Sequence, residues 1–154
     1  MTKKVAIIAS KGTLDNAYPP FLLASTAAAL GFEVKIFFTF YGLQLLTKAP
    51  SLKISPLGNP AMPMPVPIPS FIQIIPGLEW LATWMMKRKL KQKGVASWQQ
   101  LREMCVESDV ELIACQMTVD LFDYQNDDFI EGVSHGGAAT FLEFASEADI
   151  TLYI

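Results

Sequence analysis

The sequence predicts one α/β domain in which a mainly parallel, five-stranded sheet forms the middle layer of a three-layer sandwich. Two observations predict this class. Short apolar runs rich in Val and Ile, bounded by polar residues, are typical of buried parallel strands. Segments with helical signals separate these runs along the chain. Strands that alternate with helices imply right-handed crossovers and helices on both faces of the sheet.

Length and composition limit the domain organisation. The chain has 154 residues and is 51% hydrophobic, which suits a single domain over residues 1–154. The net charge of −3 gives no indication of a nucleic-acid partner. The apolar run in MTKKVAIIASKG is too short for a signal peptide, and two cysteines do not make a disulfide framework. We therefore expect a cytoplasmic protein with reduced thiols.

The first elements form a strand, loop and helix unit. KKVAIIAS, at 3–10, has the signature of a buried strand. In the loop that follows, Asp15 or Asn16 can cap a helix, and Pro19 and Pro20 are tolerated in its first turn. The helix continues through FLLASTAAAL.

A second strand and a proline-rich segment come next. FEVKIFFTF, at 32–40, repeats the strand signature, and a short helix at 43–48 stops before Pro50. LKISPL, at 52–57, is expected as a weaker third strand. From about 58 to 77 the chain is apolar and rich in proline. Proline rules out a regular helix or a central strand here and favours an extended, polyproline-like chain.

The second half contains two helices with clear end signals. LEWLATWMMKRKL predicts a helix at 78–90, whose basic end suits the negative end of the helix dipole. Ser97 and Gln100 form an S-x-x-Q capping box that starts the next helix. The remaining elements are a fourth strand at 109–115, a turn at 134–137, a helix at 138–149 and a fifth strand at 150–154.

The two cysteines occupy different kinds of position. Cys105 shares one apolar helical face with Trp98 and Leu101, so we expect it to pack as a small hydrophobe. Cys115 lies at the carboxyl end of a predicted strand, where a following turn of helix can favour the thiolate. Position alone leaves Cys115 open between a buried hydrophobe and a reactive thiol. We do not expect a disulfide between them, because its Cα atoms must lie within roughly 7 Å.

Loops at the carboxyl ends of strands are the candidate ligand sites, because ligands collect there in open parallel sheets. Glycines in such loops let backbone N–H groups approach an anion. No loop has the spacing of a dinucleotide fingerprint or a Walker A motif, and one histidine with two separated cysteines cannot assemble a typical zinc site. We expect no metal and no cofactor. The candidate ligand-binding residues are Ser10, Lys11, Gly12, Gln116, His135, Gly136 and Gly137.

Residues 65–93 combine an apolar stretch with a basic end. Prolines and Glu79 interrupt any span of about 20 residues, so we do not expect a transmembrane helix. Contact with a membrane surface remains an alternative, because Trp80 and Trp84 precede a cluster of Lys and Arg. We favour packing over the domain or against another subunit, since a large exposed apolar patch promotes association. A homo-oligomer is therefore expected.

Several segments together resemble the DsrE/DsrF-like family, namely AIIASKGTLDNAYP, FFTFYGL, GNPAMPMPVPIP, PGLEWLAT, ACQMTVDL and GGAATFLEFASEADITLYI. The resemblance covers nearly the whole chain. The proline-rich block followed by ACQMT is specific to a DsrE-related branch sometimes described as a peroxiredoxin family, although no peroxiredoxin-like cysteine motif is present. The resemblance implies a DsrEFH-like, flavodoxin-like fold that assembles as oligomers.

The same resemblance implies that Cys115 accepts sulfane sulfur, as a persulfide or thiosulfonate, and passes it on. This chemistry needs a thiolate that attacks the donor and is accessible to an acceptor thiol. We therefore expect an intracellular sulfur carrier or a sulfurtransferase. Its partners would be sulfur donor and acceptor proteins or small sulfane-sulfur compounds. The alternative is a non-catalytic oligomeric module that binds a small anion or nucleotide, or a membrane-surface partner protein.

Overall fold

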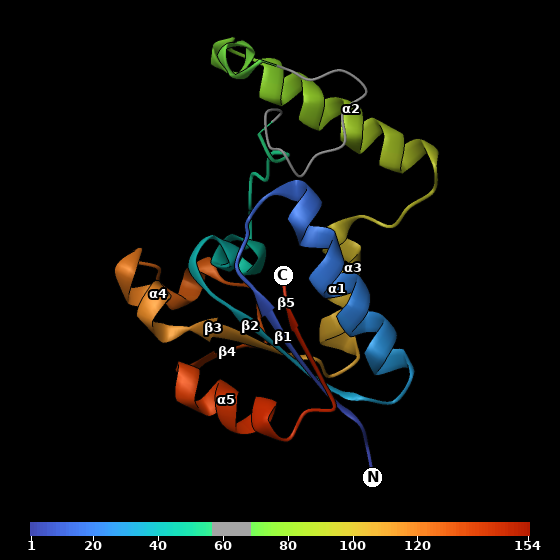
Figure 1. Ribbon diagram of the computed structural model, residues 1–154, viewed down its shortest axis with the longest axis vertical. Coiled ribbons are helices and arrows are strands. Elements are labelled where there is room, and N and C mark those ends of the chain that lie inside the picture. Colours follow the sequence, from blue (N-terminus) through green and yellow to red (C-terminus); the bar gives the residue numbers. More distant parts are fainter. Residues whose placement is uncertain (57–68) are drawn as a thin grey trace.

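A parallel sheet of five strands runs through the middle of the described structure (Figure 1). The structure is a computed structural model that describes residues 1–56 and 69–154. The strand order is β4-β3-β2-β1-β5, and every neighbouring pair is parallel. The predicted α/β class is confirmed. The strands are β1 (Lys4–Ala9), β2 (Glu33–Phe38), β3 (Glu111–Cys115), β4 (Val133–Gly136) and β5 (Ile150–Tyr153).

Helices lie on both faces of this sheet and complete the three layers (Figure 1). α1 and α3 pack on one face and α5 lies on the other. Side chains alternate between the faces along each strand, so Val5 and Ile7 join the larger apolar core under α1 and α3, whereas Ala6 joins the smaller core under α5. The helices are α1 (Leu14–Ala29), α3 (Trp98–Glu107) and α5 (Ala138–Ser146).

One strand prediction and one turn prediction were wrong. No strand forms within residues 52–56, because their backbone groups bind helices instead of a sheet. The Lys53 carbonyl accepts from the Leu14 amide at 2.8 Å, and the Ile54 amide donates to Thr83 Oγ1 at 3.1 Å. The segment at 134–137, predicted as a turn, largely belongs to β4, which pairs with β3 at one edge of the sheet.

The start of α1 also differs from the prediction. Thr13 is the N-cap residue and makes no capping hydrogen bond through its side chain, while Asp15 lies in the first turn. Asn16 donates to Thr13 Oγ1 at 2.6 Å and does not cap the helix. Pro19 and Pro20 lie inside the helix, beyond its first turn. They deprive the helix of two amide donors, so tertiary packing of its buried face must sustain this region.

The capping box predicted for α3 is confirmed. Ser97 Oγ accepts from the Gln100 amide at 3.2 Å, and the Ser97 amide donates to Gln100 Oε1 at 2.8 Å. The short helix predicted at 43–48 is a 3-10 helix, Phe40–Leu46, that begins directly after β2. Its Gly42 lies so close to β1 that a Cβ would sit 2.2 Å from the Ala9 carbonyl oxygen.

An arm, residues 69–94, extends away from the sheet (Figure 1). It contains a short 3-10 helix, Ser70–Ile74, and α2, Leu78–Gln92, which matches the helix predicted at 78–90. Part of the proline-rich segment predicted at about 58–77 lies outside the described residues. Within residues 1–56 and 69–154, no helix has both the length and the apolar character needed to cross a membrane.

Candidate functional site

Cys115 is the last residue of β3 and the N-cap residue of the short helix α4, Gln116–Leu121. It pairs in the parallel register with Gly136, the last residue of β4. α5 begins two residues after Gly136, with Gly137 as its N-cap residue. Since neighbouring strands lie roughly 4.8 Å apart, two helices start beside Cys115. This places the cysteine at the carboxyl edge of the sheet.

The thiol of Cys115 is buried on the α5 face. The residue is 4% exposed and makes no capping hydrogen bond to α4. Its core also contains Phe37 and Phe141, whose rings stack with centroids 5.0 Å apart. The accessible sulfur expected from the sequence is therefore not exposed in this conformation, because α5 covers the end of β3 on this face. The other members of this core are Ala6, Ile113 and Phe144.

Gly136 and Gly137 form the connection between β4 and α5. A Cβ added at Gly136 would lie 3.0 Å from Ile113 Cγ2, so the absent side chain lets β4 and β3 pack closely on the α5 face. A Cβ added at Gly137 would meet no atom within 4 Å. Gly136 thus lies in tight packing next to Cys115, whereas Gly137 has open space around it.

His135 and Gln116 meet at the edge of the sheet, but on the opposite side from the thiol. His135 Nδ1 lies 3.1 Å from Gln116 Oε1, and Gln116 Nε2 donates to Asp120 Oδ1 at 2.8 Å. His135 pairs in register with Ala114, whose side chain points into the larger core, away from the face that holds Cys115. Gln116, which contacts the histidine, is the residue that follows Cys115 in the chain.

The remaining candidate ligand residues lie elsewhere. Ser10, Lys11 and Gly12 follow β1, which β2 separates from β3. Two strand spacings place them roughly 10 Å from the end of β3. Ser10 Oγ donates to the Ile154 carbonyl at 3.1 Å, and a Cβ on Gly12 would sit 2.2 Å from the Tyr41 carbonyl oxygen. This loop therefore packs against its neighbours instead of joining Cys115.

The sequence analysis missed the role of Thr118 in holding α4. Thr118 is fully buried, and its Oγ1 accepts from the Phe40 amide at 3.2 Å and lies 3.3 Å from Thr39 Oγ1. These bonds join α4 to the segment after β2. In the sequence, Thr118 is simply a threonine three residues after Cys115. Its partner Phe40 is 78 positions away in the chain, so no local pattern could have predicted the contact.

Cys105 lies in the larger core, as its helical position predicts. It is fully buried, and its thiol donates to the Phe21 carbonyl at 3.4 Å. Burial raises the pKa of Cys105 to about 12, so the thiol stays protonated at neutral pH. Both cysteines are free thiols. In the part of the chain that the structure describes, no three His, Cys, Asp or Glu side chains gather as metal ligands.

Comparison with known proteins decides the family. The model of the DsrE/DsrF/DrsH-like family matches residues 1–153. This chain belongs to that family. The match extends over all five strands, which agrees with the resemblance seen in the sequence.

Two curated relatives align with the DsrE/DsrF-like chain over almost their full lengths. The sulfur carrier protein DsrE2 of Allochromatium vinosum is 61% identical over 156 residues, covering 99% of this chain and 98% of the relative. The uncharacterized protein YrkE of Bacillus subtilis is 29% identical, with the same coverage. Among solved structures, the ychN protein from E. coli superposes with a TM-score of 0.56 at 12% identity, covering 99% of this chain and all of that one. The last likeness shows the fold alone.

Proposed function

We propose that this chain is a sulfur carrier that holds sulfane sulfur on Cys115 and passes it to a partner. The observation that carries the proposal is the place of Cys115, at the end of β3 and beside the first residues of α4 and α5. Reactive groups collect at the carboxyl ends of the strands in open parallel sheets. The relative at 61% identity that is named a sulfur carrier supports the same chemistry. Cys105 is unsuited to it, because burial keeps that thiol protonated.

The transfer follows thiol and disulfide exchange chemistry. The Cys115 thiolate attacks the outer sulfur of a donor persulfide, R–S–S⁻, forming Cys–S–S⁻ and releasing R–S⁻. With tetrathionate, attack on a central sulfur gives Cys–S–S–SO₃⁻ and releases thiosulfate. An acceptor thiolate then attacks the sulfur bonded to Cys115 Sγ, the S–S bond to Cys115 breaks, and the Cys115 thiolate is regenerated. One cysteine is sufficient, and repeated turnover would make the same chain a sulfurtransferase.

Access to Cys115 requires a local movement, since the residue is only 4% exposed. We place this movement at Gly136 and Gly137. Glycine permits backbone changes that other residues resist, and Gly137 has open space around it. A shift there would lift the first turn of α5 from the sulfur. Partner binding at this edge can supply the driving force.

The proposed partners are sulfur donor and acceptor proteins or small sulfane-sulfur compounds. A reducing compartment such as the cytoplasm suits a carrier that works through a free thiol. We also propose that the chain forms a homo-oligomer, because its arm exposes a large apolar surface, including Trp80 and Trp84.

Incubation with thiosulfate, polysulfide or tetrathionate, followed by intact-mass measurement, tests the proposal. A carrier gains sulfur on a single cysteine and loses it to an added acceptor thiol. The burial of Cys115 favours a second candidate, a non-catalytic module that binds a small anion or nucleotide. Absence of loading with all three donors would support that module and contradict the carrier.

A further inference from the structure

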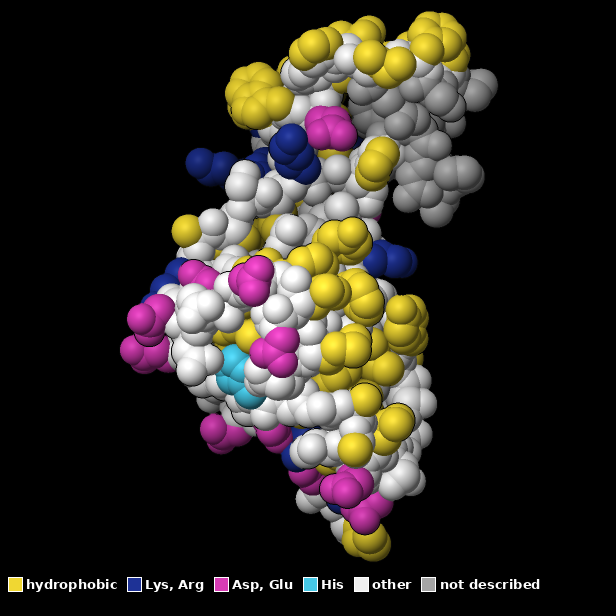
Figure 2. Space-filling view, turned by 90° about the vertical axis from the view of Figure 1, so that its left-hand side faces the viewer, with side chains coloured by type: hydrophobic (Ala, Val, Ile, Leu, Met, Phe, Trp, Pro, Cys, Tyr) yellow, Lys and Arg dark blue, Asp and Glu magenta, His cyan; other side chains and the backbone are white. Residues whose placement is uncertain are grey.

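The outer face of α2 is an apolar stripe that no described part of the chain covers. Trp80, Leu81, Trp84 and Met85 recur at i, i+1, i+4 and i+5, so they share one side of the helix. Their exposed fractions are 68, 44, 46 and 58%. Figure 2 shows apolar side chains along the outer edge of the arm. Thr83, on the opposite side of α2, is buried and holds the arm to the Ile54 amide.

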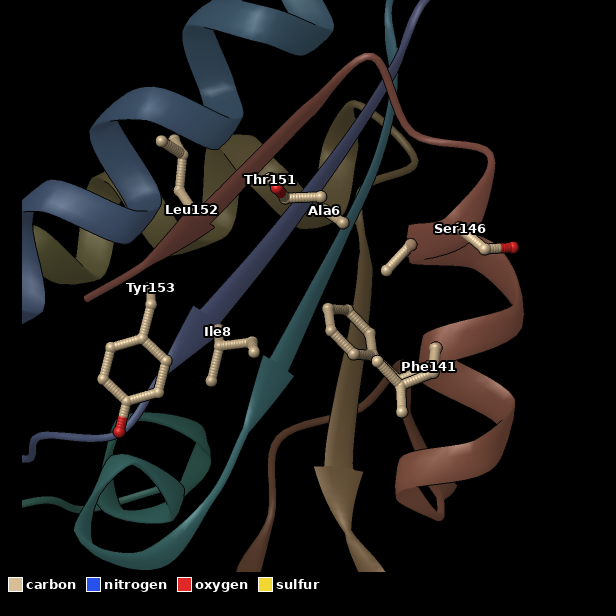
Figure 3. Close-up of a pocket in the computed structure, with 9 residues that line it drawn as sticks. Ala6, Ile8, Phe141, Ser146, Thr151, Leu152 and Tyr153 are labelled. Carbon is tan, nitrogen blue, oxygen red and sulfur yellow. The ribbon is translucent and has the colours of Figure 1, made fainter.

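A second apolar surface lies on the body of the domain, between α5 and the edge strand β5. It is a groove of about 550 Å³, and Figure 3 shows its labelled side chains on β1, β5 and α5. α5 leaves β5 uncovered on this face, where Thr151 and Tyr153 are exposed. Its apolar lining comes mainly from Ala6, Ile8, Phe141, Leu142, Ala145 and Tyr153.

The charges of the two surfaces are complementary. The arm carries five Lys and Arg residues but one Glu, in a chain whose net charge is −3. Next to the groove, α5 and the following turn carry Glu143, Glu147 and Asp149. Lys4 pairs with Glu147 at 2.6 Å, which leaves an excess of negative charge at this end of the groove.

We propose that the apolar stripe of α2 packs into the α5–β5 groove of a second copy of this chain. The arm then supplies the helix that this face of the sheet lacks. Its basic end meets the acidic end of the groove, which fixes the direction of the helix. Cys115 does not line the groove, and association and sulfur loading are measured separately, so a failure of one is distinguishable from a failure of the other.

A second copy suits these surfaces better than a lipid bilayer does. A bilayer would take up the stripe of α2 but leave the groove empty, whereas a second copy covers both surfaces in one contact. An aromatic side chain buries roughly 150–250 Å². Trp80 and Trp84 are 68 and 46% exposed, so each arm has about one such side chain left to bury. Leu81, Met85 and the groove itself supply the rest of the roughly 1,200 Å² that a specific interface needs.

Two charge substitutions test the two surfaces separately. Trp80→Glu alters the stripe and Leu142→Glu alters the groove, and both positions are at least 60% exposed, so each variant should fold. We expect the wild type to be oligomeric by light scattering and each variant to associate roughly tenfold or more weakly. Met104→Glu, at an apolar position on α3 that is 48% exposed, is the matched control and should associate like the wild type.

Mixing the two variants gives the sharpest result. The intact arm of Leu142→Glu can enter the intact groove of Trp80→Glu, so the mixture should form heterodimers at a concentration at which each variant alone is monomeric. A monomeric wild type, a mixture that stays monomeric, or an oligomer that survives both substitutions would overturn the proposal. Flotation of a monomeric wild type with anionic phospholipid vesicles, lost only in Trp80→Glu, would assign the stripe to a lipid surface and overturn it as well.

Discussion

At the scale of single residues, the two cysteines differ in their surroundings more than in their burial. Cys105 is fully buried between α1 and α3 with its thiol bonded to a carbonyl, while Cys115 is 4% exposed where the sheet ends. Solvent exposure alone would not distinguish the packing cysteine from the proposed reactive one, because both are buried. Their positions in the sequence do distinguish them, because Cys105 lies on a helical stripe with Trp98 and Leu101, whereas Cys115 is the last residue of a strand.

The raised pKa of Cys105 predicts a loss of stability in alkali. Its ordinary pKa of 9.0 applies to the unfolded chain, and burial raises the value to about 12 in the fold. The contribution of this thiol to stability is fully present below pH 9 and is lost as the pH rises toward 12, because the unfolded chain releases the proton first. Urea unfolding from pH 8 to 11 should show this fall, and Cys105→Ala should lack that part of it. Equal slopes in both proteins would contradict the assignment.

At the scale of elements, α4 depends on Thr118 for its attachment. Thr118→Val keeps the shape but removes the acceptor for the Phe40 amide and the partner of Thr39. An unpaired buried donor costs about 1–3 kcal/mol, so the free energy of unfolding should fall by this amount in urea titrations. Thr118→Ser retains the hydroxyl and should lose less. If the two variants are equally stable, the hydrogen bonds do not hold α4.

Local patterns predicted the elements whose signals lie within a few residues of one another. The capping box of Ser97 and Gln100 and the apolar run of β1 are examples, and both formed as expected. β4 escaped prediction because an edge strand of four residues, Val133–Gly136, looks like a turn in sequence. The strand expected at 52–57 failed for the opposite reason, since its apolar residues face helices that contribute the hydrogen-bond partners.

The candidate site was predictable only in part. The order of the strands in the sheet decides which loops lie side by side. Local sequence patterns do not predict that order. Gly136 adjoins Cys115 because β4 lies next to β3, whereas Ser10 and Gly12 are kept away from Cys115 by β2. Gln116 adjoins Cys115 only because it is the next residue in the chain. Side chains alternate between the two faces along a strand, so His135 lies on the face opposite to Cys115.

At the scale of the whole molecule, Asp15 helps to join the arm to the domain. Its carboxylate accepts from the Ser55 amide at 2.9 Å and the Ser55 hydroxyl at 2.7 Å, next to the Ile54 amide that binds Thr83 of α2. Burial alone would raise the pKa of Asp15, but the Ser55 hydroxyl and amide outweigh it and lower the pKa below its ordinary 3.8. The carboxylate is thus favoured in the fold.

Asp15→Ala should therefore loosen the arm in a pH-dependent way. Because the pKa of Asp15 is lower in the folded protein than in the unfolded chain, its carboxylate stabilises the fold at any pH above the pKa of the unfolded chain. This contribution is lost as the pH falls through the lower pKa of the folded protein. We expect the variant to be less stable than the wild type at pH 7 and the difference to shrink below about pH 4. Limited proteolysis within residues 69–94 should also be faster at pH 7. Asp15→Asn keeps one acceptor and should lie between the two proteins. A difference that does not change with pH would contradict the role of the charge.

The measurement that tests the account most directly is intact mass after sulfur loading of two single variants. Cys115→Ser should remain folded but gain no sulfur. Cys105→Ser should still load, and it should lose about 1–3 kcal/mol of stability because a hydroxyl is buried in an apolar core. Loading that survives Cys115→Ser and disappears in a folded Cys105→Ser would contradict the assignment of Cys115 as the sulfur-carrying residue.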